Sequence, residues 1–186
     1  MTQFVLDDKH QSDALWRYYE CSVQALASLR SDLRAGRPVA INHFLGLTND
    51  EVDDLLSELR AELNHEVCLA LAAYFEGVLR VDMVARARGS KRENEKGMRD
   101  LNRHMRGLLK EANGEVHRVR WDEVLDAWKA VGDSKVVGAM KPVVKFRHWL
   151  AHGRYFPERS GLGSTASPEL FMQEIDAFLQ EFPQAG

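Results

Sequence analysis

Apolar residues recur every three or four positions along most of this chain, the spacing that lines one face of an α-helix. The predicted helices cover residues 11–33, 49–88, 91–112, 121–131, 135–152 and 168–182. The fifth of these could also begin as late as Pro142, and residues 39–47 follow no clear pattern. No second, strand-rich domain is indicated. The pattern therefore predicts an all-α protein, a bundle of four to six helices with one long central helix.

Local signals support several of these boundaries. The segment Gly36-Arg37-Pro38 should break the first helix. Thr48 should cap the long helix, because Glu51 follows at the capping-box position. Gly153 stands where a helix C-cap favours glycine, and Pro168 suits the first turn of the last helix. The long helix exceeds what is usual in a globular domain, so we expect a kink or break within it.

Composition narrows the class of protein. The 186 residues are 45% hydrophobic and 28% charged, which suits one globular domain with a proper core. The net charge of −3 speaks against a protein that coats nucleic acid non-specifically. Acids dominate residues 48–66, however, and bases dominate residues 77–92 and 141–159. A basic surface on an acidic protein suits an anionic ligand bound at one site, although each run taken alone could equally be a solvated helix face.

The chain carries no membrane or secretion signal that we recognise. Residues Met1 to Asp8 lack the basic start and apolar centre of a signal peptide, and the longest apolar run, Val67 to Phe75, is too short to cross a bilayer. Cys21 and Cys68 form no metal-binding pair, and we expect both to be free, buried thiols in a reducing compartment. These features predict a cytoplasmic protein.

The segment from Lys141 to Tyr155 concentrates the candidate chemistry. On an ideal helix, four basic residues share one stripe of about 60°: Lys141, Lys145, His148 and His152. Three apolar residues on the opposite face predict the core side: Val143, Phe146 and Leu150. Arg147 lies on the flank, about 140° from His152, so the two do not converge within one ideal helix.

Arg147 and His152 suit chemistry on a phosphodiester. A guanidinium holds phosphate with paired donors, and an imidazole transfers protons near neutral pH. The structural alternative is that both residues compensate the dipole at a helix end. His148 and His152 also have a zinc-compatible spacing, but Trp149 stands where a zincin needs glutamate and no third ligand is apparent. No metal is therefore expected.

The run from Arg147 to Tyr155 (Arg-His-Trp-Leu-Ala-His-Gly-Arg-Tyr) resembles the signature helix of the HEPN superfamily, in particular the ribonuclease and toxin-like domains of the RiboL-PSP type. The resemblance implies a homodimeric, metal-independent endoribonuclease without a cofactor, whose composite site uses Arg147 and His152 and leaves a 2′,3′-cyclic phosphate. His148 stands where asparagine is more familiar in the family, and Arg154 precedes Tyr155 where some HEPN toxins carry their tyrosine. Four residues are expected to support catalysis or bind RNA: Lys145, His148, Arg154 and Tyr155.

The segment from Leu69 to Arg80 is apolar nearly all round, which predicts a helix buried on more than one face. Glu76 and Arg80 form an i, i+4 pair within it, and the pattern Glu-x-x-x-Arg-x-Asp resembles the second conserved helix of some HEPN families. That resemblance implies that Glu76 and Arg80 line the same cleft as the signature residues; the alternative is a structural salt bridge. A second pair, Asp82 and Arg86, is expected to be solvated.

Aromatic residues and histidines outside the signature are assigned to the core or the surface. Three tryptophans are expected in the core: Trp16, Trp121 and Trp128. Trp149 is expected at a subunit interface. Three histidines with polar neighbours are expected on the surface: His65, His104 and His117.

The resemblance also implies domains and partners. Residues 48–186 would be a HEPN-like bundle and residues 1–47 a helical extension packed on it, together one compact unit. HEPN proteins of this kind occur in toxin–antitoxin, phage-defence and stress systems, which implies an RNA substrate and an antitoxin or another regulatory protein as partner. One alternative is a non-catalytic HEPN-type module that binds RNA, nucleotide or protein. Another is a structural domain in which Arg147 and His152 merely cap a helix.

Overall fold

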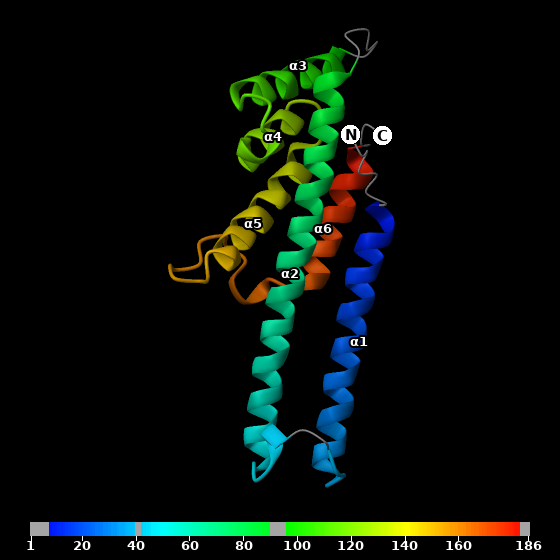
Figure 1. Cartoon of the computed structure of the whole chain (residues 1–186), viewed down its shortest axis with the longest axis vertical. Helices are drawn as coiled ribbons and strands as arrows, with labels where there is room; N and C mark the ends of the chain where they lie inside the picture. The colour runs from blue at the N-terminus through cyan, green and yellow to red at the C-terminus, as the bar shows by residue number, and fades with distance from the viewer. Residues whose placement is uncertain (1–7, 40–41, 90–95, 183–186) are drawn as a thin grey trace.

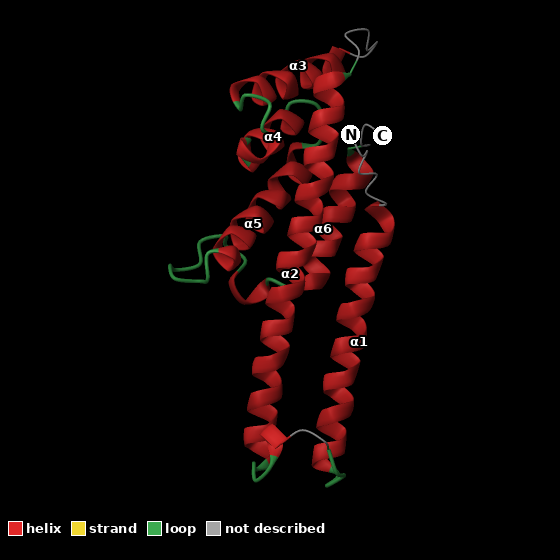
Figure 2. Ribbon diagram, viewed as in Figure 1, coloured by secondary structure: helices red, strands yellow, loops and turns green. Residues whose placement is uncertain are grey.

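The computed structural model describes residues 8–39, 42–89 and 96–182. These ranges form six α-helices and contain no strand (Figures 1 and 2). The helices are α1 (Asp8–Arg34), α2 (Asn49–Arg88), α3 (Lys96–Glu111), α4 (Trp121–Lys129), α5 (Ser134–Ala151) and α6 (Pro168–Glu181). The described ranges also contain three short 3₁₀ helices: η1 (Asn42–Phe44), η2 (Val116–Arg118) and η3 (Gly163–Thr165). The predicted all-α bundle with one long central helix is confirmed.

The long helix α2 starts as its cap predicts. The backbone N–H of Thr48 donates to the Glu51 carboxylate at 2.7 Å, and the N–H of Glu51 donates to the Thr48 hydroxyl at 3.4 Å. The expectation of a break was wrong, because α2 stays helical from Asn49 to Arg88. It is supported along its length: α1 runs beside one half, while α3 to α6 pack around the other (Figure 1).

Other helix boundaries lie close to their predictions. The third helix was predicted from residue 91; α3 begins at Lys96, and residues 90–95 lie outside the described ranges. α5 begins at Ser134, the earlier of the two expected starts, and is capped by the carboxylate of Asp133, which accepts from the N–H of Lys135 at 2.7 Å. Pro142 therefore lies inside α5 and removes one backbone hydrogen bond from it.

The core surrounds the middle and the α3 end of α2. Phe178 of α6 sets its ring edge against Phe75 of α2 and Trp128 of α4, with centroid distances of 5.1 and 6.0 Å. Trp128 is fully buried, as predicted, whereas Trp16 and Trp121 are half-buried against this core. A smaller cluster, Phe44, Val52 and Leu56, holds α1 and α2 together at their connected ends.

Tyr19 ties α1 to two other helices. Its hydroxyl donates to the carboxylate of Glu169 on α6 at 2.8 Å and accepts from the guanidinium of Arg60 on α2 at 2.8 Å. Burial is the main reason why the pKa of Tyr19 rises to about 12. The first helix is thus joined to the rest of the chain by polar bonds as well as by apolar packing.

The predicted exposure of Asp82 and Arg86 and the predicted burial of Cys21 were wrong. Asp82 and Arg86 form an ion pair at 2.9 Å, and both residues are buried instead of solvated. The guanidinium carbon of Arg86 lies 4.4 Å from the ring centroid of Trp128, which covers it. Cys21 is exposed on α1, whereas Cys68 is buried as expected. Burial raises the pKa of the Cys68 thiol to about 12. Among the described helices, none is long and apolar enough to cross a membrane.

Candidate functional site

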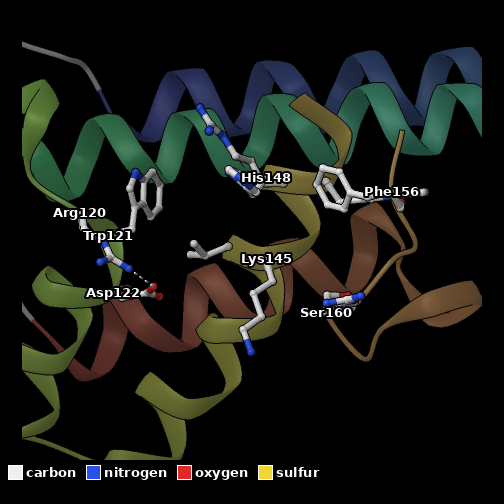
Figure 3. Close-up of a pocket in the computed structure, with 12 residues that line it drawn as sticks. Arg120, Trp121, Asp122, Lys145, His148, Phe156 and Ser160 are labelled. Carbon is white, nitrogen blue, oxygen red and sulfur yellow. Dashed lines mark hydrogen bonds and ion pairs between the residues drawn. The ribbon is translucent and has the colours of Figure 1, made fainter. Parts of the chain in front are cut away.

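A cavity of about 630 Å³ opens beside α5, between the start of α4 and the loop of residues 156–160 (Figure 3). Its size lies within the range of about 300–1,000 Å³ that is usual for small-ligand sites. Basic side chains line it: Arg120, Lys145, Arg147, His148 and Arg159. Aromatic side chains line it as well: Trp121, Trp149 and Phe156. The remaining lining residues are Ala72, Asp122, Val144 and Ser160.

Apolar and charged side chains both line this cavity. The apolar side chains of Ala72, Val144 and Trp149 are buried or half-buried, whereas Arg120 and Lys145 are exposed. Three arginines and Lys145 share the cavity lining with one carboxylate, that of Asp122, which lies 3.7 Å from the guanidinium of Arg120. The cavity therefore favours an anionic ligand that also has an apolar part.

Arg147 is held on the cavity wall by an ion pair with α2. Its Nη2 lies 3.0 Å from Oε2 of Glu76, and the other oxygen of that carboxylate accepts from Nε of Arg80 at 2.8 Å. Arg80 also donates to the carbonyl of Val116. Glu76 thus joins two guanidiniums, with its side chain only 15% exposed. Glu76 and Arg80 lie behind Arg147 and are not among the residues that line the cavity.

Arg147 keeps hydrogen-bonding capacity. Its Nε is buried and makes no hydrogen bond within the described part of the chain. A buried donor without a partner is costly, so an acceptor that reached this atom would be favoured. A phosphate oxygen is such an acceptor, because guanidinium and phosphate match in geometry.

His148 and His152 lie against each other on the exposed side of α5, with ring centroids 4.2 Å apart and the ring planes inclined at 60° in an edge-on contact. His148 lines the cavity, and its ring centroid lies 6.2 Å from that of Phe156. His152 is the C-cap residue of α5, is exposed, and is not among the lining residues. Within one chain, Arg147 and His152 therefore have different partners, Glu76 and His148 respectively.

The turn after α5 directs Arg154 away from the cavity. Gly153 and Arg154 have positive φ angles of 72° and 61°, so the chain reverses sharply there. Arg154 then binds both carboxylate oxygens of Glu62 at 2.8 Å and donates to Nδ1 of His65 at 3.1 Å. Arg154 thus connects this turn to α2. Tyr155, the next residue, is 93% exposed and does not line the cavity.

His65 is half-buried, so its prediction as a surface histidine was wrong. Its ring centroid lies 6.0 Å from that of Phe146 and 6.1 Å from that of Trp149. Burial lowers the pKa of His65, and the charge of Arg154 lowers it further. Trp149, predicted at a subunit interface, packs within the chain, and its indole N–H donates to the carbonyl of Phe156 at 2.8 Å.

The cavity wall at residues 156–160 is ordered by local hydrogen bonds. The Glu158 carboxylate accepts from the N–H of Ser160 and, at 3.2 Å, from the N–H of Gly163. Hydrogen bonding with the Ser160 side chain, and then with the backbone N–H groups of Ser160 and Gly163, lowers the pKa of Glu158. The Ser160 hydroxyl accepts from the N–H of Leu162 at 3.0 Å. This loop is therefore shaped before any ligand binds.

Several cavity residues were not predicted from the sequence as site residues: Arg120, Asp122, Phe156, Ser160, and Trp121, which was expected only in the core. The run Arg120-Trp121-Asp122 offered a weak signal, an aromatic residue between two charges at a helix start. Arg159 was counted in the basic run 141–159 without a role. Among the described residues, the cavity included, no group of three or more His, Cys, Asp or Glu side chains could hold a metal ion.

Comparisons with protein-family models, with characterised proteins and with solved structures found no match to this chain. The HEPN resemblance therefore rests on two segments of the sequence, Tyr74 to Arg88 and Arg147 to Tyr155.

Proposed function

We propose that this chain is a helical domain that binds RNA and cleaves it. In this reaction the 2′-hydroxyl group of the RNA attacks the adjacent phosphate. One observation carries the proposal: Arg147, anchored by Glu76, faces a basic and aromatic cavity beside the neighbouring pair His148 and His152. The cations supply affinity for the phosphate backbone, and aromatic side chains supply surfaces for bases.

The chemistry needs one cation and two proton-transferring groups. Arg147, which lines the cavity, stabilises the charge that grows on the phosphate. One histidine takes the proton of the 2′-hydroxyl as the 2′-oxygen bonds to phosphorus, and another protonates the departing 5′-oxygen. The products are a 2′,3′-cyclic phosphate and a free 5′-hydroxyl. Because Arg147 and histidine supply charge and proton transfer, the step needs no metal.

A homodimer would complete this site. In one chain Arg147 pairs with Glu76 while His152 lies on another face of α5. Two copies of α5 related by a two-fold axis would present His152 of the partner subunit to the phosphate bound at Arg147. The two histidines of one chain, His148 and His152, are the alternative acid and base.

The second candidate is a module that binds RNA or nucleotide without cutting it. The observation in its favour is that His152 is not among the lining residues, so the cavity keeps its five basic side chains without it. The HEPN resemblance, rather than the site, supports a cytoplasmic role in a toxin–antitoxin, defence or stress system with a regulatory protein as partner.

The decisive experiment compares RNA cleavage in EDTA by the wild type, Arg147→Ala and His152→Ala, with His104→Ala on the exposed side of α3 as the control. Thermal unfolding and light scattering establish that each variant is folded and what its oligomeric state is. We expect cyclic-phosphate ends from the wild type and the control, and a loss of about 10²–10⁴-fold in His152→Ala. Folded wild type that binds RNA but leaves every RNA intact would exclude the ribonuclease and favour the binding module.

A further inference from the structure

We propose that the cavity captures one unpaired nucleotide of an RNA strand, with its base on the apolar floor and its phosphates at the cationic rim. This inference rests on the proposed function and names its substrate class. The inference makes Arg120, Trp121 and Phe156 specificity-determining residues. They are distinct from Arg147 and His152, the residues of the proposed cleavage step.

The combination of apolar and cationic side chains in the cavity suits a nucleotide better than a simple anion. Ala72, Val144 and Trp149 form an apolar floor, and a bare phosphate would gain nothing from it. A nucleobase presents flat apolar faces that stack on aromatic side chains, and Trp121 and Phe156 offer such surfaces. Figure 3 shows these two labelled residues on either side of His148.

The charges at the rim match the strand that continues on both sides of the base. Arg120, Lys145 and Arg159 are exposed cations from three segments of the chain, so they can meet successive phosphates. Asp122 beside Arg120 adds an acceptor next to a donor, the combination that reads the edge of a base. A base within a duplex is stacked and paired and cannot enter the cavity, so an unpaired nucleotide is the fitting ligand.

The proposed base site adjoins the proposed proton-transfer site. The ring centroid of His148 lies 6.2 Å from that of Phe156 and 4.2 Å from that of His152. A base seated against Phe156 therefore leaves its ribose and 3′-phosphate close to His148. Base capture and cleavage are linked through this one histidine.

Contacts within the chain position the aromatic walls, which reduces the entropy lost on capture. Trp121 rests on Phe75 of the core with centroids 6.2 Å apart. The carbonyl of Phe156 accepts the indole N–H of Trp149 at 2.8 Å. Neither aromatic wall needs a new backbone conformation to receive a base.

The test measures binding of four nucleoside 5′-monophosphates and ribose 5-phosphate by calorimetry, and of unstructured and fully paired RNA by anisotropy. The proteins are the wild type, Trp121→Leu and Arg120→Ala. Arg118→Ala is the matched control, because Arg118 is an exposed cation in the same connection, pairs with Glu115 at 2.8 Å and does not line the cavity. Arg120 is exposed, so its variant remains informative if Trp121→Leu fails to fold.

We expect the nucleotides to bind more tightly than ribose 5-phosphate, and unpaired RNA more tightly than duplex. Trp121→Leu should weaken nucleotide binding about five- to hundredfold, the range expected for one lost stacking contact, and Arg118→Ala should not. Equal affinity for nucleotide and sugar phosphate, or unchanged affinity in both cavity variants, would overturn the inference. Capture of free nucleotides without any preference for unpaired RNA would also overturn it, because the ligand would then not be a strand.

The two proposals fail in different ways. Nucleotide binding by a wild type that cuts no RNA supports the base site and contradicts the ribonuclease. Cleavage by a wild type that binds no mononucleotide and cuts paired and unpaired RNA equally supports the ribonuclease and contradicts the base site.

Discussion

The guanidinium of Arg147 on α5 lies 3.0 Å from the carboxylate of Glu76 on α2, so a cation that faces the cavity is positioned by a helix distant in sequence. The same carboxylate binds Arg80, which in turn donates to the carbonyl of Val116. Glu76 therefore connects α5, α2 and the connection that leads to α4. Any change in this carboxylate should alter both the stability of the protein and the position of Arg147 at the cavity.

Replacing Glu76 by glutamine should destabilise the protein by about 2 kcal/mol, because two neighbouring guanidiniums lose the negative charge between them. RNA affinity should fall as well, since Arg147 loses its anchor. Urea denaturation measures the first effect and anisotropy the second. Glu66→Gln, an exposed carboxylate on the same helix, is the control. Equal stability of the two variants would show that Glu76 does not hold Arg147.

Stability should decline as the pH falls below about 6.5, the ordinary pKa of histidine, because the pKa of His65 is lowered in the folded state. At a pH between the pKa of His65 in the folded state and its pKa in the unfolded state, the unfolded chain binds more protons. Lowering the pH through this range therefore favours unfolding. Arg154→Ala removes a cation that donates to His65 at 3.1 Å, and should raise that pKa. Titration of the imidazole by NMR measures both values. An ordinary pKa in the wild type would contradict the half-buried position of His65.

Two glycines should respond oppositely to alanine. A Cβ at Gly132 would lie 1.9 Å from the ring of Phe182, which Trp128 and Phe178 hold at centroid distances of 4.9 and 4.7 Å. Gly132→Ala should therefore cost about 3 kcal/mol through overpacking. A Cβ at Gly138, exposed within α5, meets nothing within 4 Å, so Gly138→Ala should stabilise by about 1 kcal/mol. Thermal unfolding of the pair checks the signs, and a tolerated Gly132→Ala would dispute the packing of Phe182.

Thiol labelling should distinguish the two cysteines. Cys21 is exposed and should react quickly with an aromatic disulfide reagent, whereas Cys68 is buried with a pKa of about 12 and should react only after unfolding. The expected result is one fast thiol in the native protein, two in denaturant, and no fast thiol in native Cys21→Ser. Rapid labelling of Cys21→Ser would mean that the helices around Cys68 open readily.

Much of the fold could be predicted because its signals are local. The Thr48–Glu51 capping box marked the start of α2, and Pro168 marked the start of α6. The unbroken course of α2 could not be predicted in this way, because the helices packed along it stabilise its length. Burial of Asp82 and Arg86 also escaped prediction, since the ring of Trp128 that covers Arg86 belongs to a distant helix.

The candidate site was predictable only in part. The basic stripe of α5 followed from helical periodicity, and His148 and His152 are neighbours as that periodicity requires, with ring centroids 4.2 Å apart. Arg154 and Tyr155 belong to the same segment, yet a sharp turn directs Arg154 to Glu62 and His65, away from the cavity. The direction of a side chain after a helix end depends on what it meets there, and the local pattern does not contain that information.

The sequence by itself determined where the helices lie and which of their faces are apolar, because periodicity, caps and breakers act over a few neighbouring residues. Only the tertiary structure decided which charges are paired and which remain available for a ligand. Glu76 neutralises part of the charge of Arg147 across two helices, while Arg120 and Arg159 join Lys145 at one cavity from separate segments. Such pairing depends on distance in space, because the interaction between two charges decreases with their separation and with the water between them.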